Sequence, residues 1–464
     1  MNFSISQVPG MKVTIMGLGL HGGGAASAAF FAEHGAEVTV TDLQERGALK
    51  NTIAQLHEYP ITYVLGEHRN RDFEKADLVI KNPAVPSTSP FLRLAPVVES
   101  DISVFLSLVN NPVIAITGSK GKSTVASAVQ FVLEKAYSKS YLGGNITVSP
   151  LLFVDEILKE TEKHSAPVVL ELSSWQLADL RGKEVCKPKI SVITNILPDH
   201  QNRYSGMDDY IEDKKVIYQE QGKEDTAVFN YDDPYTRIFE IEAKAEINYF
   251  SSLKKEIPFK GGWLENRRGI INESTKPAEC FADDLKIPGR HNALNLLCSG
   301  IILNRFGVPL SIIREQLPRF PGISHRLEFT AEKRGVLFYN DSAATIPHAS
   351  YNAIHSFSDP IHLILGGTDK ELDFSILEES LSIPASLHLL EGSATKKIIS
   401  ICMEKDIPFN GPYPDIESAV KEAYLSARAG EIVVMSPGCA SFGMFKNEFH
   451  RGDRFKESVL KLAP

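Results

Sequence analysis

The chain has 464 residues, of which 43% are hydrophobic and 23% are charged, and its formal net charge is −9. The acidic balance argues against nucleic-acid binding as the main role, because such binding usually needs a basic surface. The 5 cysteines contain no Cys-x-x-Cys pair, which fits a reducing compartment better than a disulfide framework or a zinc site. Neither a signal-peptide pattern nor a run of about 18 apolar residues occurs, so we expect a cytoplasmic protein of about two to four domains.

The first predicted element is an apolar strand over residues 12–17, which runs into the glycine pattern GLGLHG of residues 17–22. A small-residue helix over residues 23–35 and a second strand ending at Asp42 complete a Rossmann fingerprint. The glycines let the backbone approach a diphosphate, the helix N-terminus favours its charge, and Asp42 could hold a ribose hydroxyl. The alternative is a tight strand–helix turn that binds no ligand.

The second region contains a glycine- and lysine-containing stretch, Gly118–Thr124, between a buried-type strand and a helix. In this order backbone N–H groups can wrap phosphates, Lys122 can neutralise their charge, and Ser123 or Thr124 can ligate Mg²⁺. The glycine spacing is shorter than in the general phosphate-loop pattern, since Ile116 stands where that pattern has glycine. A chance turn is therefore the alternative.

Further polar candidates follow the next strands of this region. Glu171 ends an apolar strand, where a second Mg²⁺ ligand would come from, although it could also be a partly exposed strand-end glutamate. Asp199 and His200 follow another strand, and His200 is either functional or structural. The lysine pair Lys214 and Lys215 lies in a helical stretch, and by itself such a pair indicates a solvated helix face.

The third region begins near Ile323 and contains three strand-plus-loop units. The first strand ends at Asp341 and Ser342, the second leads through a glycine pair to Lys370, and the third leads to a predicted helix start at Ser441. Strands that alternate with helices predict a parallel α/β domain whose ligands lie at the carboxyl ends of the strands. A helix N-terminus at Ser441 would suit an anion such as a carboxylate.

A Rossmann fingerprint, a phosphate-type loop and a third α/β region in one chain suit a reaction that uses a nucleotide-linked substrate, ATP and a third reactant. ATP-driven amide bond formation fits, because ATP activates a carboxylate as an acyl phosphate and an amine then attacks it. We expect an α/β protein of three domains. These are a Rossmann-like domain over residues 1–109 for the nucleotide-linked substrate, a central P-loop domain over 110–322 for ATP, and a C-terminal Rossmann-like domain over 323–464 for the incoming amine.

Several stretches carry a resemblance to a known family: ITGSKGKST (116–124), LELSSWQL (170–177), NDSAAT (340–345) and SPGCASFGMFKN (436–447). In these, and in order over nearly the whole chain, the sequence resembles the Mur ligases, whose phosphate loop has the shorter glycine spacing. The resemblance implies ATP-dependent, ADP-forming addition of D-glutamate to UDP-N-acetylmuramoyl-L-alanine by a cytoplasmic monomer with two Mg²⁺ sites, in peptidoglycan synthesis. It also implies that the first domain binds UDP and not NAD.

The resemblance also assigns roles to residues by position. The implied catalytic set is Lys122, Glu171, His200 and Lys214. One Mg²⁺ would be held by Ser123 and Glu171, and the other by His200 and Lys214, whose carbamylation would make it a carboxylate-like ligand. The implied ATP-binding residues are Gly118, Ser119, Lys120, Gly121, Lys122, Ser123, Thr124, Asn292, Asn295, Arg326 and Asp341, with the two asparagines at the adenine. The implied substrate-binding residues are Leu20, His21, Asp42 and Asn82 for the UDP part, Asn145 for the muramoyl part, and Thr345, Lys370, Ser441 and Phe442 for the glutamate carboxylates.

The sequence departs from the family pattern at three positions. Ala343 replaces a family lysine, so a cation such as Lys120 or Lys370 would have to replace it, or the substrate differs. Ala84 replaces a glycine of the uridine loop, and Glu448 replaces an aromatic residue. Another Mur-type or folylpolyglutamate-type ligase, an NAD-dependent dehydrogenase and a non-catalytic nucleotide-binding regulator are the alternatives, the last favoured only by Ala343.

Overall fold

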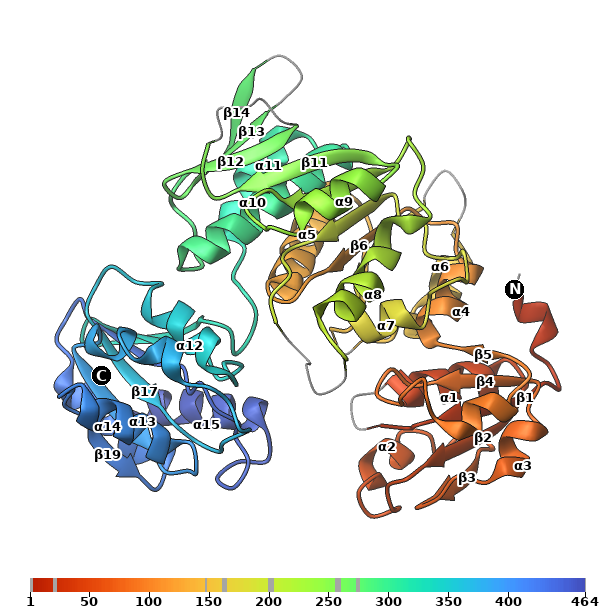
Figure 1. Cartoon of the computed structure of the whole chain (residues 1–464), viewed down its shortest axis with the longest axis horizontal. Helices are drawn as coiled ribbons and strands as arrows, with labels where there is room; N and C mark the ends of the chain where they lie inside the picture. Colours follow the sequence, from red (N-terminus) through yellow and green to blue (C-terminus); the bar gives the residue numbers. More distant parts are fainter. Residues whose placement is uncertain are drawn as a thin grey trace. The chain divides into compact units, whose positions relative to one another are not determined.

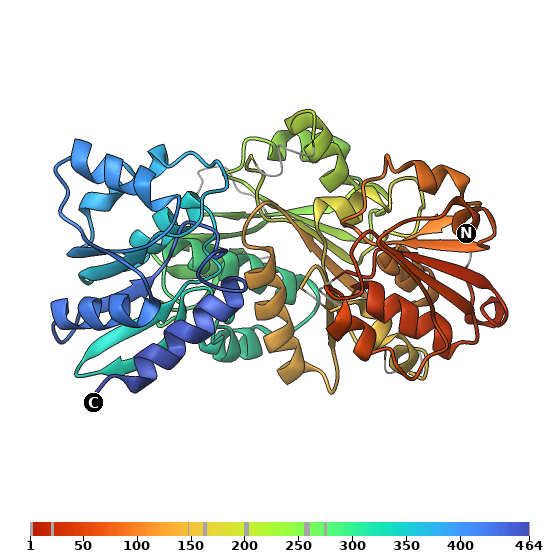
Figure 2. The same cartoon turned by 90° about the horizontal axis from the view of Figure 1, so that it is seen from below.

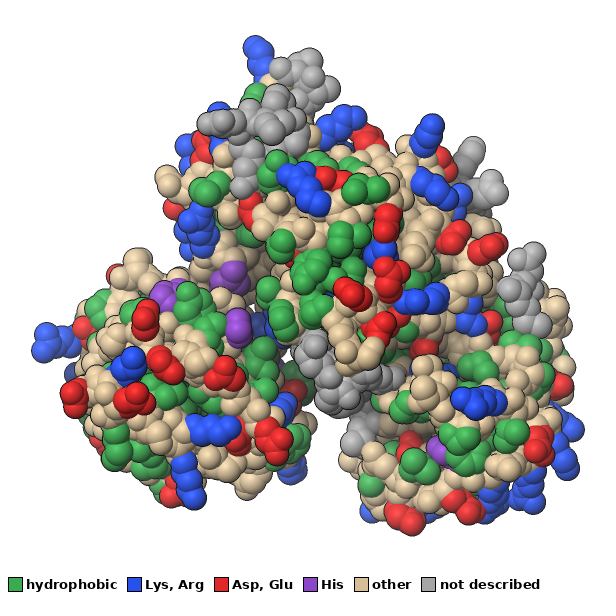
Figure 3. All heavy atoms as spheres, in the orientation of Figure 1, with side chains coloured by type: hydrophobic (Ala, Val, Ile, Leu, Met, Phe, Trp, Pro, Cys, Tyr) green, Lys and Arg blue, Asp and Glu red, His purple; other side chains and the backbone are tan. Residues whose placement is uncertain are grey.

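The computed structural model describes residues 3–19, 23–146, 148–160, 165–198, 204–254, 260–272 and 276–463. Three β-sheets with helices on their faces confirm the predicted α/β fold class (Figure 1, Figure 2). The chain divides into two compact units, Met1–Phe281 with Asn295–Leu317 and Ala282–Leu294 with Pro318–Pro464. No helix among the described residues combines the length and apolar character that crossing a membrane requires. Figure 3 shows acidic and basic side chains interspersed on the face in view.

The first sheet is parallel and has the strand order β3-β2-β1-β4-β5. Its strands are β1 (Lys12–Met16), β2 (Glu37–Asp42), β3 (Thr62–Leu65), β4 (Leu78–Lys81) and β5 (Val98–Glu99). Its helices are α1 (Gly23–Glu33), α2 (Lys50–Ala54), α3 (Asn70–Glu74) and α4 (Asp101–Leu108). Alternate residues of β1 and β4 point to opposite faces, so Ile15 and Ile80 lie in the core cluster with Phe31 of α1 while Met16 and Val79 pack with Phe73 of α3. The predicted strand–helix–strand order is confirmed.

The second sheet has nine strands in the order β14-β13-β12-β11-β10-β9-β6-β8-β7, with antiparallel pairing only among β12, β13 and β14. Its strands are β6 (Val113–Thr117), β7 (Tyr141–Gly144), β8 (Val168–Glu171), β9 (Ile190–Ile193), β10 (Thr226–Asn230), β11 (Glu246–Ser251), β12 (Gly261–Glu265), β13 (Arg268–Asn272) and β14 (Pro277–Phe281). The associated helices are α5 (Lys122–Ala136), α6 (Val154–Ile157), α7 (Ser174–Ala178), α8 (Met207–Gln219), α9 (Thr236–Glu242), α10 (Arg290–Arg305) and α11 (Leu310–Gln316). Since β8, β6 and β9 are parallel neighbours, the residues that follow them meet at one edge.

The third sheet belongs to the second unit and has the order β15-β16-β20-β17-β18-β19. Its strands are β15 (Glu328–Lys333), β16 (Val336–Asn340), β17 (Ile361–Leu365), β18 (Ser386–Leu390), β19 (Asn410–Tyr413) and β20 (Ile432–Met435). Helices α12 (Pro347–Ile354) and α13 (Thr395–Glu404) share a core cluster with one face, and α14 (Ile416–Ser426) and α15 (Glu448–Lys461) share one with the other.

The predicted helix start at Ser441 is wrong. Residues 442–444 form a turn, and α15 begins only at Glu448. The side chain of Asn447 accepts a hydrogen bond from the backbone N–H of His450 at 2.8 Å and so provides the N-cap. Ser441 therefore lies in the connection between β20 and α15.

The entry of α1 depends on the close approach of its backbone to the preceding loop. A methyl carbon built on Gly24 would lie 2.3 Å from the carbonyl oxygen of Gly17 and 2.5 Å from that of Leu18. We expect Gly24→Ala to lower the free energy of unfolding by about 2 kcal/mol or more, because backbone atoms must move apart. Differential scanning fluorimetry should show a midpoint several degrees lower. Gly47→Ala, where nothing lies within 4 Å, is the control, and an equal midpoint for both variants would contradict this account.

Candidate active site

The glycine-containing loop between β6 and α5 is held by the residues that follow β9. The backbone N–H of Ser119 donates to the carbonyl oxygen of Asn195 at 2.9 Å, and that of Lys120 donates to its side-chain oxygen at 2.9 Å. The Thr194 hydroxyl donates to the Lys120 carbonyl at 2.6 Å. Gly118 has φ +142°, and a methyl carbon there would lie 1.9 Å from the Thr194 hydroxyl oxygen. Two strand ends thus fix one loop conformation.

Two ammonium groups converge on this loop. Lys122 Nζ, at the start of α5, donates to the carbonyl oxygens of Gly118 at 2.9 Å and of Ser119 at 3.1 Å. Lys214 Nζ, from α8, donates to the same Gly118 oxygen at 3.0 Å and lies 4.6 Å from the ring centre of Tyr210. The Tyr210 hydroxyl is 2.9 Å from the Ser119 hydroxyl. Both helices contact β6 (Figure 1), and the paired cations suit a phosphate.

The two consecutive lysines of α8 have different surroundings. Lys214 is 1% exposed and faces the loop, whereas Lys215 is 6% exposed and forms ion pairs with Glu212 at 2.6 Å and Glu242 at 2.7 Å. The solvated helix face that the pair alone indicated, and that stayed the expectation for Lys215, is therefore wrong. One residue along a helix turns the side chain by about 100°, which separates a loop-facing lysine from an ion-paired one.

Glu171 ends β8 as a buried carboxylate with 1% exposure, so it is not a partly exposed strand-end glutamate. The side-chain amide of Asn145 donates to its Oε1 at 2.9 Å, and the backbone N–H of Asn145 donates to its carbonyl oxygen at 2.7 Å. Its Oε2 is buried and has no hydrogen-bond partner among the described residues. A buried carboxylate oxygen without a donor is costly, and a cation would satisfy it.

The carboxylate of Asp42 holds the first glycine loop. Its Oδ2 accepts hydrogen bonds from the backbone N–H groups of Leu18 at 2.9 Å and Gly19 at 3.2 Å, and its Oδ1 accepts one from Gln44 at 2.9 Å. Asp42 is 8% exposed, and its carboxylate stabilises the loop conformation through these hydrogen bonds. Leu20 and His21 lie outside the described residues.

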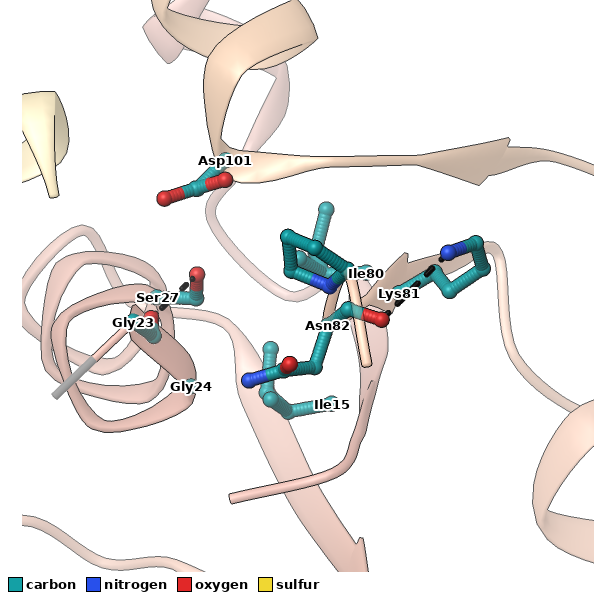
Figure 4. Close-up of a pocket in the computed structure, with 9 residues that line it drawn as sticks. Ile15, Gly23, Gly24, Ser27, Ile80, Lys81, Asn82 and Asp101 are labelled. Carbon is teal, nitrogen blue, oxygen red and sulfur yellow. Dashed lines mark hydrogen bonds between the residues drawn. The ribbon is translucent and has the colours of Figure 1, made fainter. Parts of the chain in front are cut away.

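A pocket opens beside this loop at the N-terminus of α1 (Figure 4). Asn82, after β4, and Asp101, at the start of α4, border it from separate segments. Burial raises the pKa of Asp101, whose carboxylate accepts from the hydroxyl of Ser149 at 2.8 Å. The lining residues are Ile15, Gly23, Gly24, Ser27, Ile80, Lys81, Asn82, Pro83 and Asp101.

In the second unit, polar residues gather where β16, β17 and β20 end. Asp341 is 7% exposed and accepts hydrogen bonds from the backbone of Leu327 at 3.1 Å and the hydroxyl of Ser436 at 2.7 Å. Burial raises its pKa to about 7. The carboxyl group therefore titrates near neutral pH.

A buried arginine underlies the second pocket of this unit. Arg451 of α15 is 1% exposed and donates to the Ser342 hydroxyl at 3.0 Å, the Ser342 carbonyl at 2.8 Å and the Cys439 carbonyl at 3.1 Å. Burial lowers its pKa to about 10. All these hydrogen-bond acceptors are neutral, and the nearby charges of Glu448 and Asp341 offset only part of the lowering of its pKa. The pocket is lined by Gly366, Gly367, Leu390, Glu391, Ala440, Ser441, Phe442, Met444, Phe445 and Arg451.

Comparison with known proteins gives a family for this geometry. The Mur ligase middle domain model matches residues 116–303, and the Mur ligase MurD-like N-terminal domain model matches residues 11–105. A UDP-N-acetylmuramoylalanine–D-glutamate ligase of Roseiflexus sp. (strain RS-1) is 37% identical over 473 residues, covering 98% of this chain and 99% of the relative. The enzyme of that name from Borreliella burgdorferi (strain ZS7) is 38% identical over 468 residues, covering 99% and 100%. The chain belongs to the Mur ligase family.

Solved structures of Mur ligases share the fold. UDP-N-acetylmuramate-alanine ligase MurC from Thermotoga maritima matches with a TM-score of 0.61 at 20% identity, covering 97% of this chain and 99% of that one. MurF ligase from Thermotoga maritima in complex with ADP matches with a TM-score of 0.57 at 14% identity, covering 92% and 96%. At such identities the likeness supports the architecture alone.

The structure brings only part of the residue set implied by the Mur ligase resemblance together. At the phosphate-type loop, Lys122, Lys214 and Asn295 lie near one another, and a methyl carbon on Gly121 would be 2.5 Å from the Asn295 side-chain oxygen. Asn292 instead donates to the carbonyl oxygen of Pro288 at 2.7 Å. His200 lies outside the described residues. In the second unit, Ser441 is buried, Thr345 is half-buried, and Arg326, Lys370 and Phe442 are exposed.

Sequence reasoning missed three residues that shape this Mur ligase site. Asn195 follows the end of β9, and Glu171 is the last residue of β8, so a polar residue at or after a strand end is a signal that could have found it. Tyr210 lies one helical turn before Lys214, but nothing in its spacing indicates a hydroxyl next to the loop. No sequence pattern marks Arg451. Its buried guanidinium nevertheless contacts Ser342, the neighbour of Ala343.

The raised pKa of Asp341 gives the stability of the second unit a pH dependence. The folded carboxyl keeps its proton up to about pH 7, whereas an unfolded one loses it near pH 4. Its contribution to stability is therefore complete below about pH 4 and is lost as the pH rises through about 7. We expect Asp341→Asn to remove this loss, so that β16 and β20 amides of the variant lose less protection than wild type between pH 5.5 and 8. Amide hydrogen exchange, corrected for intrinsic rates, measures this, and equal losses in both proteins would contradict it.

Proposed function

We propose that this chain is an ATP-dependent ligase that joins D-glutamate to UDP-N-acetylmuramoyl-L-alanine and releases ADP and phosphate, in peptidoglycan synthesis. The observation that carries the proposal is the convergence of Lys122 and Lys214 on the Gly118 carbonyl, on the same sheet edge as the partnerless oxygen of Glu171. Relatives that match over nearly the full chain bear the name of this activity. The proposed substrates are small molecules, and we propose that the chain acts as a monomer.

We propose three domains, over residues 1–109, 110–322 and 323–464. Each range contains one complete sheet, namely β1–β5, β6–β14 and β15–β20. The first domain would bind the UDP part at the Asp42-braced loop and the pocket beside Asn82. The second would bind ATP, and the third would bind the amino acid.

The ATP phosphates would lie against the loop of Gly118–Gly121 and the first turn of α5, where backbone N–H groups and the helix N-terminus favour anions. Lys122 would exchange its contacts with loop carbonyls for phosphate oxygens. A Mg²⁺ ion would fit Glu171, whose Oε2 lacks a donor in the described part of the chain, and Ser123 at the start of α5. When bound, it would supply charge neutralisation of the phosphates.

The reaction would proceed in two displacements. A carboxylate oxygen of the UDP-linked substrate attacks the γ-phosphorus of ATP, and the bond to the leaving oxygen of ADP breaks, giving an acyl phosphate. The amine of D-glutamate then attacks the acyl carbon, and the tetrahedral species expels phosphate while the nitrogen loses a proton. Lys122 offsets the charge that develops at the phosphoryl group, and the loop holds the reactants in line.

We propose that Lys214 acts in its carbamylated form, together with His200, at a second Mg²⁺. Its 1% exposure shields such a carbamate from water, and its Nζ reaches the phosphate loop at Gly118. Carbamylation would replace an ammonium with an anionic oxygen donor, which is the ligand type Mg²⁺ prefers. Lys215 has no such role, because its ammonium is engaged by two glutamates.

The amino acid would bind at the pocket that Ser441, Phe442 and Arg451 line, with Thr345 and Lys370 as further candidates. Arg451 supplies a buried positive charge whose hydrogen bonds all go to neutral acceptors, which suits an acidic amino acid. It also places a cation next to the position where Ala343 replaces the family lysine. That replacement is the one observation that favours a second candidate, a Mur-type ligase for a different amino acid.

Phosphate release from ATP and Mg²⁺ tests the proposal directly. With UDP-N-acetylmuramoyl-L-alanine and D-glutamate we expect release and one amide product per phosphate, and with L-glutamate we expect release at least about a hundredfold slower, since the wrong amine position loses alignment. Failure to release phosphate with either isomer would overturn the proposed function. Faster turnover of another amino acid would establish the second candidate.

Variants of Lys214 and Lys215 test the proposed carbamylation in the same assay. Both Lys214→Met and Lys214→Arg should lower kcat by at least about a hundredfold, because neither side chain can form a carbamate. Lys215→Met is the matched control and should retain kcat within about threefold. Full activity of Lys214→Arg would contradict carbamylation and would leave Lys214 a simple cation.

A further inference from the structure

Lys81, the last residue of β4, holds two segments with one buried ammonium. It is 4% exposed, and its Nζ lies 2.8 Å from a carboxylate oxygen of Asp179, which follows α7. The same Nζ donates to the carbonyl oxygens of Asn82 at 3.3 Å and Val85 at 2.9 Å. Figure 4 shows the Lys81 side chain directed away from Ser27 and Asp101, so its charge lies behind the pocket wall.

Asn82 and Pro83 line the pocket, and we call the segment Asn82–Val85, which includes both carbonyls that Lys81 binds, the pocket wall. The Asn82 backbone N–H donates to the Met16 carbonyl at 3.0 Å, and its side-chain oxygen accepts from the backbone of Ala84 at 3.0 Å. A methyl carbon on Gly17 would lie 3.0 Å from Asn82 Cβ. The wall is thus fitted against the first glycine loop, and a ligand that displaces it must act on the two carbonyls that Lys81 holds.

The other partner of Lys81, Asp179, lies at the end of the helix that follows β8 of the second sheet. Asp179 is the C-cap of α7, a helix whose N-cap is Ser173, two residues after Glu171. The Ser173 hydroxyl and the Gln176 side chain cap this start reciprocally. Helix α7 also contacts α8, which carries Lys214. A short rigid helix therefore connects Asp179 with the carboxylate and the lysine that face the phosphate loop.

We propose that Lys81 is a positioning residue that couples occupation of the first-unit pocket by the uridine nucleotide substrate to α7, and through α7 to Glu171. This inference rests on the proposed function, since it takes the pocket as the UDP site. The coupling element is the Lys81–Asp179 ion pair, which neutralises two charges withdrawn from water. A shift of the Asn82–Val85 wall must move the ammonium, and the ammonium is bound to the end of α7.

A second ion pair joins the same parts without touching the wall and serves as a control. Lys183 Nζ lies 2.9 Å from Glu99 Oε2 and donates to the Val98 carbonyl at 2.6 Å. Its side chain is 25% exposed, against 4% for Lys81. Lys183→Met therefore removes a charge between these segments and leaves the pocket wall unchanged.

The chain provides its own reporter of α7. Its 2 tryptophans are Trp175, on α7, and Trp263, on β12. Trp263→Phe leaves Trp175 as the single indole, and UDP-N-acetylmuramoyl-L-alanine added without ATP probes the pocket alone. We expect a saturable change in Trp175 emission in this background and in Lys183→Met. We expect at least a threefold smaller change in Lys81→Met, at nucleotide saturation verified by calorimetry.

Because Lys81→Met removes the ammonium from beside the buried Asp179 carboxylate, the double variant Lys81→Met/Asp179→Leu removes both charges and preserves a packed interior. It should fold, lose the emission change, and show kcat for the ligase reaction lowered by about tenfold with KM for ATP unchanged. Lys81→Arg should restore part of the emission change.

A full emission change in the double variant would overturn the coupling, and so would an unchanged Trp175 signal in the reference protein when calorimetry shows nucleotide binding. Absence of nucleotide binding by calorimetry in the reference protein would instead overturn the proposed function, and the coupling with it.

Discussion

The carbonyl oxygen of Gly118 accepts hydrogen bonds from Lys122 and Lys214 at 2.9 and 3.0 Å, and the candidate site depends on this convergence. The two ammonium groups share one acceptor, and the neighbouring strand end holds the loop that carries it. Asn195 and Thr194 provide this support, since they bind the loop backbone from the neighbouring strand end. In the proposed function, an ATP phosphate would bind at this loop. The parallel order of β8, β6 and β9 brings the loop, its supports and Glu171 to one edge.

Burial of charge recurs at each functional position. Glu171 has an oxygen without a donor among the described residues, Asp341 titrates near neutral pH because it is buried, and Arg451 donates only to neutral hydrogen-bond acceptors. Such groups cost stability when they stand alone and gain it when a ligand of opposite charge arrives. Lys81 and Asp179 are different, because they neutralise each other. In this account, the charges left for ligands serve binding, and the Lys81–Asp179 ion pair serves the proposed coupling between the first and second sheets.

The sequence predicted the sheets well because strand, glycine turn and helix follow one another locally in β1–α1 and β6–α5. It also placed Glu171 at the end of a strand and the glycine turn before a helix, and the structure confirms both positions. Their binding roles stay predictions. Helix faces were harder, and Lys215 was expected in solvent although Glu242, on another helix, pairs with it. Ser441 was expected to start a helix, but the Asn447 cap places that start later. Lys81–Asp179 and Arg451 depend on contacts between residues about 100 positions apart, and no local pattern encodes such contacts.

The central claim is that the phosphate loop activates a carboxylate as an acyl phosphate. UDP-N-acetylmuramoyl-L-alanine with both carboxylate oxygens labelled with ¹⁸O tests it most directly, in a reaction with ATP, Mg²⁺ and D-glutamate. One labelled oxygen should leave with phosphorus, so mass spectrometry of the inorganic phosphate should find one ¹⁸O atom per amide formed. Amide formation accompanied by unlabelled phosphate would contradict the account.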